Sequence, residues 1–183
     1  VEKYSHIDIT GCGNPNYGGG IGCYYGTAMR FLTAYLSVTP GERIITGTAR
    51  MQQRPIQILV NALRELGAEI EYVHKEGYPP LRIKGSVLKG NEITLKGNVS
   101  SQYISALLMI GPTLKDGLTL HLSGEIISRP YINLTLQLMQ DFGARAVWTS
   151  PTILQKRSFQ SRERLECSFL LVSDCHIISR SGN

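Results

Sequence analysis

The chain has 183 residues, of which 42% are hydrophobic, and this is enough apolar sequence for one good-sized core or two small ones. Its net charge of +5 suits anionic ligands but, without a concentrated basic stripe, excludes a typical nucleic-acid binder. No run reaches the roughly 18 apolar residues of a membrane helix and the start VEKYSHIDIT does not resemble a signal peptide, so we expect a cytoplasmic protein without membrane contact.

The first recognisable element is a helix that begins at Gly26. Segment 11–26 is so rich in glycine and asparagine that it predicts a loop. In GTAMRFLTAYLS, by contrast, Met29, Leu32 and Leu36 recur at spacings of three and four, which predicts an amphipathic helix. Gly and Pro then separate, in chain order, a strand at Arg43 to Thr46, a helix that starts at Pro55, and strands at Ala68 to Val73, Leu81 to Lys84 and Asn91 to Lys96.

The same order of elements then recurs, with a helix at Ser101 to Ile110, a strand at Leu118 to Leu122, a helix opened by Pro130 and a strand at Ala144 to Trp148. Matching landmarks lie 72 to 77 residues apart in the two halves, and they include Thr33-Ala34 with Ser105-Ala106, Arg54-Pro55 with Arg129-Pro130, and Gly67-Ala68 with Gly143-Ala144. This period predicts two copies of an α+β module, in which helices pack on small mixed sheets.

Both ends of the chain differ from its centre. After Ser150 the sequence is rich in serine, arginine and cysteine, and its one strand candidate is Phe169 to Val172. We therefore divide the chain into an atypical Gly-rich segment 1–25, the two modules at 26–150 and an atypical tail 151–183, and we interpret the ends as frame-shifted or otherwise non-native sequence. All four cysteines lie in these ends, with gaps too long for a typical zinc site.

Polar residues gather where the predicted helices begin: Gly26-Thr27, Arg54, Ser100-Ser101-Gln102, and Ser128 through Tyr131. Free backbone N–H groups and the positive end of the helix dipole make such positions natural sites for phosphate or carboxylate. Serine and threonine at helix starts are, however, mostly plain N-caps, and Arg54 and Tyr131 have equally ordinary structural explanations. No single one of these positions therefore indicates an anionic ligand, but the four positions together do.

Five motifs resemble the EPSP synthase family, the 3-phosphoshikimate 1-carboxyvinyltransferases, in their order along the chain. They are GTAMRFLTA, GTARMQQRPI, YPPLRIKG, SSQYISALLM and SRPYINLTLQLMQDFG, and they span Gly26 to about Trp148. The resemblance implies transfer of the enolpyruvyl group of phosphoenolpyruvate to shikimate 3-phosphate, without a metal or organic cofactor. It also implies an inside-out α/β barrel fold of two domains, each with three similar modules, of which this chain holds two.

The resemblance implies a role for each polar position in turn. Ser100 and Ser101 resemble the pair that binds the phosphate of shikimate 3-phosphate, and Gln102 the glutamine that touches both substrates. Ser128 and Tyr131 resemble further contacts to the shikimate side.

On the phosphoenolpyruvate side, Gly26, Thr27 and Arg54 resemble the family's contacts, and Arg54 also lies where the herbicide glyphosate binds. Arg30 is interpreted as a structural neighbour. The chain has Tyr24-Tyr25 where the family motif has Asn-Ala.

The family's lysine-containing N-terminal motif and the charged residues of its second domain do not occur in this sequence. We therefore expect no catalytic residue within the chain and no activity from the chain alone. We also expect a fragment that is marginally stable or self-associated, although its full-length relatives are usually monomeric. The alternatives are a relative of the UDP-N-acetylglucosamine enolpyruvyl transferases, which share the fold, and a non-catalytic anion-binding module.

Overall fold

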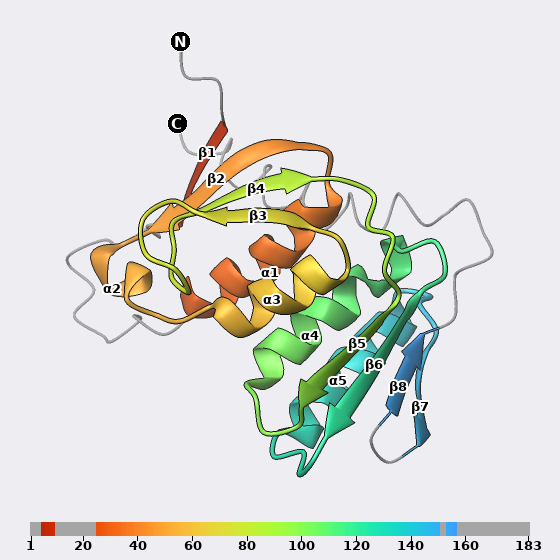
Figure 1. The fold of residues 1–183 in the computed structure, drawn as a ribbon. Helices are drawn as coiled ribbons and strands as arrows, with labels where there is room; N and C mark the ends of the chain where they lie inside the picture. The colour runs from red at the N-terminus through yellow and green to blue at the C-terminus, as the bar shows by residue number, and fades with distance from the viewer. Residues whose placement is uncertain (1–4, 10–24, 151–152, 157–183) are drawn as a thin grey trace, which may run out of the picture.

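The computed structural model describes residues 5–9, 25–150 and 153–156, which form two α+β units side by side (Figure 1). The first unit contains β1 (Ser5–Ile9), α1 (Tyr25–Val38), β2 (Gly41–Gly47), α2 (Ala49–Gln52), α3 (Gln57–Glu65), β3 (Glu69–Tyr72) and β4 (Leu81–Gly85). The second contains β5 (Glu92–Lys96), α4 (Ser101–Ile110), the 3-10 turn η1 (Gly111–Thr113), β6 (Leu118–Ser123), α5 (Arg129–Asp141), β7 (Ala146–Ser150) and β8 (Ile153–Lys156).

The two sheets have the same topology. Their strand orders are β1-β2-β4-β3 and β5-β6-β8-β7, and in each sheet the first pair is parallel while the other pairs are antiparallel. The module repeat predicted from the sequence is therefore confirmed, as is the α+β class with small mixed sheets.

Four elements were not predicted, and all four are short: β1, α2, the 3-10 turn η1 and β8. The strands β1 and β8 lie within segments 1–25 and 151–183, and each completes the sheet of its own unit. The four-residue helix α2 lies between the strand predicted at Arg43 to Thr46 and the helix predicted at Pro55. The helix expected to start at Pro55 starts at Gln57 instead, because Ile56 has an extended φ of −131° and donates its N–H to the Gly77 carbonyl oxygen at 2.9 Å. The strand candidate Phe169 to Val172 lies outside the described residues.

Helix α4 is the centre of the molecule. It packs against α1 on one side and α5 on the other and also contacts α3 (Figure 1). Its buried residues are Tyr103, Ile104, Ser105, Ala106, Leu107, Leu108 and Ile110. A helix that is apolar on most of its circumference is typical of a buried position, so the packing of α4 joins the two units.

At Gly85, the last residue of β4, the sheet of the first unit lies very close to the backbone of α1. A Cβ atom at this position would overlap the carbonyl oxygens of Leu36 and Thr39 at the end of α1. The next residue, Ser86, donates its N–H to the Ser37 carbonyl oxygen at 3.1 Å. The absence of a side chain at Gly85 therefore lets the sheet approach the end of α1.

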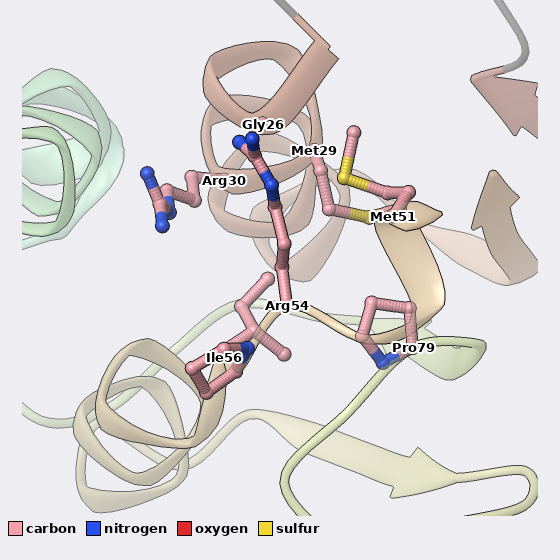
Figure 2. Close-up of a pocket in the computed structure, with 8 residues that line it drawn as sticks. Gly26, Met29, Arg30, Met51, Arg54, Ile56 and Pro79 are labelled. Atoms are coloured by element: carbon pink, nitrogen blue, oxygen red, sulfur yellow. The ribbon is translucent and has the colours of Figure 1, made fainter. Parts of the chain in front are cut away.

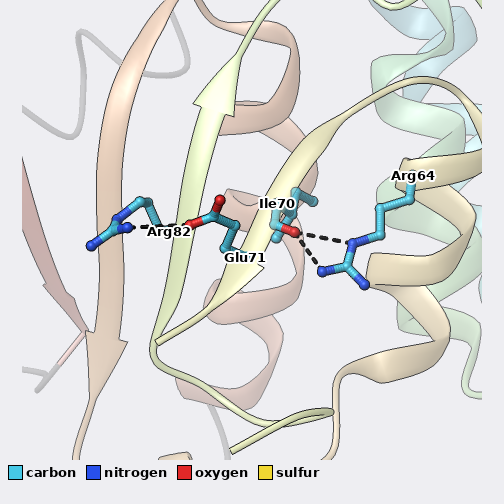
Figure 3. Close-up of polar contacts among 4 residues, drawn as sticks. All are labelled: Arg64, Ile70, Glu71 and Arg82. Carbon is cyan, nitrogen blue, oxygen red and sulfur yellow. Dashed lines mark hydrogen bonds and ion pairs between the residues drawn. The ribbon is translucent and has the colours of Figure 1, made fainter. Parts of the chain in front are cut away.

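Two arginines fasten the edge strand β3 (Figure 3). Arg64 of α3 donates to the Ile70 carbonyl oxygen from Nε at 3.0 Å and from Nη2 at 2.5 Å. Arg82 of β4 pairs with Glu71 across the strands at 3.2 Å. Helix α3 is thereby attached to the strand that follows it.

One face of α5 is apolar and exposed. Along it lie Tyr131, Leu134, Leu138 and Phe142, which are each at least half exposed and recur at helical spacing. The first unit differs at the end of this face. The backbone bonds that end α3 and α5 align Leu66 with Phe142, and Leu66 is fully buried. No helix in the described part of the chain is long and apolar enough to cross a membrane.

Candidate functional site

The starts of α1 and α4 are joined by a glutamine. Both helices begin on the same side of the molecule, at the lower left in Figure 1. The Gln102 side chain donates from Nε2 to Thr27 Oγ1 at 2.8 Å. Its Oε1 accepts a hydrogen bond from Arg30 Nη1. The first turns of two helices that are far apart in sequence thus share one amide group.

Arg54 extends from the loop between α2 and α3 to the first turn of α1, where its guanidinium lies beside Gly26 (Figure 2). A Cβ atom at Gly26 would lie only 2.6 Å from Arg54 Nη1. The glycine therefore leaves the room that the guanidinium occupies. A small hollow at this place is lined by Gly26, Met29, Arg30, Met51, Arg54, Pro55, Ile56 and Pro79.

The two arginines give this hollow a positive charge. Neither Arg30 nor Arg54 forms an ion pair with any acidic side chain of the described residues. The N-terminus of a helix adds the partial positive charge of its free N–H groups. Arginine donors beside a helix start suit a carboxylate or a phosphate, because both anions accept several hydrogen bonds at once.

The serines at the start of α4 are not used as capping side chains. Ser100 occupies the N-cap position and is exposed, and its hydroxyl makes no capping hydrogen bond. Ser101, the first helical residue, is half-buried. Since an N-cap serine usually bonds the second or third N–H of its helix, the ordinary structural explanation does not account for the Ser100 side chain.

Ser128 and Tyr131 lie at the start of α5. Ser128 is also an N-cap residue without a capping side-chain bond, and the side chain of Tyr131 is 67% exposed. Helix α5 is attached to α4 by the hydrogen bond between Ser105 Oγ and Thr135 Oγ1 at 2.7 Å. Within the described residues no hydrogen bond links the side chains of Ser128 or Tyr131 to the serines of α4, and what connects the two groups is the packing of α4 against α5.

Two further residues of this site have contacts that the sequence did not predict. Arg30, expected to be a structural neighbour, bonds Gln102. Tyr103 was not singled out, yet its hydroxyl donates to the Pro55 carbonyl oxygen at 2.8 Å and its ring lies 4.7 Å below the Arg30 guanidinium. The repeat held a signal for Arg30, because it precedes Gln102 by 72 residues, the offset of the neighbouring landmarks.

Known proteins match this chain over the same residues that form the two units. The family model described as EPSP synthase (3-phosphoshikimate 1-carboxyvinyltransferase) matches residues 25–156. A 3-phosphoshikimate 1-carboxyvinyltransferase of Bacteroides fragilis is 79% identical over 130 residues, which cover 71% of this chain and 32% of the relative. The corresponding protein of Colwellia psychrerythraea is 44% identical over 142 residues, 76% of this chain and 33% of the relative.

Among solved structures, an EPSP synthase from Acinetobacter baumannii aligns with a TM-score of 0.63 at 22% identity, and covers 86% of this chain and 31% of that one. This likeness shows the fold, a part of the EPSP synthase architecture. The chain spans about a third of the length of the curated relatives that it matches.

Proposed function

Because the chain belongs to the EPSP synthase family, we propose that it forms part of the substrate site of an enzyme that transfers the enolpyruvyl group of phosphoenolpyruvate to shikimate 3-phosphate. The high identity to relatives with that activity in their names supports the proposal. So does the chemistry of the site, since both substrates carry a phosphate and a carboxylate. The reaction is an addition followed by an elimination that releases phosphate.

Two pairs of residues bind shikimate 3-phosphate in this proposal. Ser100 and Ser101 donate their hydroxyls to the phosphate at the positive end of α4. Ser128 and Tyr131, at the start of the neighbouring helix α5, bind the shikimate side.

Phosphoenolpyruvate lies at the other helix start. Arg54 pairs with its charged groups, and Gly26 and Thr27 let it approach the first turn of α1. In this chain the named residues bind and orient the substrates, and the groups that transfer protons belong to other parts of the enzyme.

The observation that carries the proposal is the position of Gln102. Its side chain bonds Thr27 on the phosphoenolpyruvate side and belongs to the same helix turn as Ser101 on the shikimate side. A residue between two anion sites can hold the reacting groups in contact, and such positioning is a large part of catalysis by two-substrate enzymes.

A binding experiment on the whole chain tests the proposal. Shikimate 3-phosphate should shift the NMR signals of Ser100, Ser101 and Gln102, whereas shikimate should shift them much less. The double variant Ser100→Ala, Ser101→Ala should remove the difference, while Ser86→Ala, which removes a hydroxyl outside the site, should not. Equal responses to the two ligands would remove the phosphate assignment. If inorganic phosphate shifts the same signals as much as shikimate 3-phosphate does, the result would favour the non-catalytic anion-binding module instead.

A further inference from the structure

Tyr103 connects the two substrate sides of the proposed site. It follows Gln102 in the first turn of α4 and its side chain is only 6% exposed. The hydroxyl donates to the Pro55 carbonyl oxygen at 2.8 Å, across a sequence separation of 48 residues. Since Pro55 directly follows Arg54, the tyrosine of one unit touches the backbone that carries the arginine of the other.

The loop that carries Arg54 has few other attachments. The Arg54 N–H bonds the Met51 carbonyl oxygen at 3.0 Å, and the Ile56 N–H bonds Gly77 at 2.9 Å. Both of these bonds stay within the first unit. Pro55 has no N–H to donate, and the carbonyl that accepts the first bond of α3 is that of Ile56. Among the described residues, the Tyr103 hydroxyl is therefore the group that fastens this loop to α4.

The ring of Tyr103 also supports the second arginine. The Arg30 guanidinium lies over it at 4.7 Å, a distance typical of a cation–π contact, and Arg30 bonds Gln102 at the same time. One side chain thus contacts Arg30 through its ring and the neighbour of Arg54 through its hydroxyl.

We infer that Tyr103 is a positioning residue, which sets how far Arg54 reaches toward an anion at the start of α1. The inference rests on the proposed function, because it assigns phosphoenolpyruvate to Arg54. It adds a mechanical link: any shift of α4 that accompanies phosphate binding at Ser100 and Ser101 is passed to Arg54 through one hydrogen bond. The contact of Tyr103 with a main-chain carbonyl makes this link independent of the side chain at position 55.

The test is Tyr103→Phe in the whole chain. This change keeps the ring under Arg30 and removes only the hydroxyl. The matched control is Tyr72→Phe, which deletes a buried hydroxyl that has no hydrogen-bond partner among the described residues. Phosphoenolpyruvate and shikimate 3-phosphate are titrated separately by NMR, and amide exchange of Arg54 and Ile56 is measured without ligand.

In Tyr103→Phe the affinity for phosphoenolpyruvate, read at Arg54 and Gly26, should fall about three- to tenfold, the effect of one lost hydrogen bond. The response of Ser100 and Ser101 to shikimate 3-phosphate should stay, and the amides of Arg54 and Ile56 should exchange faster. The control should show neither change. Unchanged affinity together with unchanged exchange would overturn the inference.

The outcomes also separate the inference from the proposed function. If phosphoenolpyruvate leaves the wild-type signals of Arg54 unmoved, its assignment to this site is wrong. The exchange rates then decide the role of Tyr103 alone: faster exchange in Tyr103→Phe supports the attachment of the loop, and equal exchange overturns it.

Discussion

Arg30 of α1 donates a hydrogen bond to Gln102 of α4, and the two residues occupy the same position in the two copies of the repeat, 72 residues apart. The landmarks Thr33-Ala34 and Ser105-Ala106 share this offset. Equivalent turns of two equivalent helices are thus in contact. The two copies differ at this position, where the first has the cation of Arg30 and the second the neutral amide of Gln102, and this difference makes the junction asymmetric.

We first predict that Gln102→Glu weakens anion binding while the fold is kept. The carboxylate would pair with Arg30, and because the pair is half-exposed, the free energy of unfolding should change by about 1 kcal/mol or less. It would also place a negative charge between the two substrate phosphates, so binding of shikimate 3-phosphate should fall at least about tenfold. NMR titration and thermal unfolding of the same samples measure both effects.

The matched variant is Gln137→Glu, on the exposed surface of α5. It adds the same charge away from the site and should leave binding unchanged. Equal affinity of Gln102→Glu and the parent chain would show that Gln102 lies apart from the bound anion.

Gly85→Ala should destabilise the first unit strongly. The added methyl meets the carbonyl oxygens of Leu36 and Thr39, which belong to the backbone and cannot rotate away. We expect a loss of about 3 kcal/mol, at the upper end for overpacked cores, measured by urea unfolding.

Gly124→Ala is the comparison for this substitution. Gly124 has a φ of +76° but open space around its Cβ position, so the substitution introduces only backbone strain, which costs about 1 kcal/mol of stability. A smaller loss for Gly85→Ala than for Gly124→Ala would contradict the close packing of β4 against α1.

Tyr72→Phe should be neutral or stabilising at neutral pH and increasingly favourable in alkali. Burial raises the pKa of Tyr72 above 10.0, an effect that the nearby Arg64 partly opposes. Between pH 10.0 and this raised pKa the unfolded chain loses the phenol proton while the folded chain retains it, so wild-type stability falls as the pH rises.

The phenylalanine variant has no proton to lose at this position. The difference in urea midpoint between variant and parent should therefore be constant below pH 9 and grow above pH 10. A pH-independent difference would mean that Tyr72 titrates alike in both states.

The exposed face of α5 should make the chain self-associate. Contiguous apolar side chains on a helix surface are a common contact for another protein surface. Replacing Leu134, Leu138 and Phe142 by Gln should lower the associated fraction in sedimentation velocity, at unchanged helical circular dichroism.

The control for this prediction removes exposed apolar side chains elsewhere. Val87 and Val147 are 77% and 53% exposed and do not belong to the face. Their replacement by Gln should leave association unchanged, and a parent chain that stays monomeric at high concentration would refute the prediction.

The elements with strong local signals could be predicted from the sequence. The bounds of α4 agree with Ser101 to Ile110, because an apolar run there begins after two serines and stops at Gly111-Pro112. Strands β1 and β8 carry little periodicity of their own, and what defines them is pairing with β2 and β6.

The site shows the same division between local and distant information. The helix starts that carry Gly26 and Ser100, and the loop that carries Arg54, could be found from residue types near glycine and proline. The bonds from Gln102 to Thr27 and from Tyr103 to Pro55 could not, because each depends on how helices of different units pack. Nothing near Tyr103 in sequence distinguishes it from an ordinary buried aromatic residue.

The separateness of the two sheets has a consequence for the order of folding. In the described residues every strand pairs within its own unit, and the two units meet where α1 and α3 contact α4 and where α3 contacts β5. Each sheet can therefore form without the other, because its strands lie within a stretch of fewer than about 85 residues. The bonds from Gln102 to Thr27 and from Tyr103 to Pro55 require both units in place, so the site should be the last part to form. A ligand that binds both units at the site would slow the opening of the site and leave the formation of either sheet unaffected.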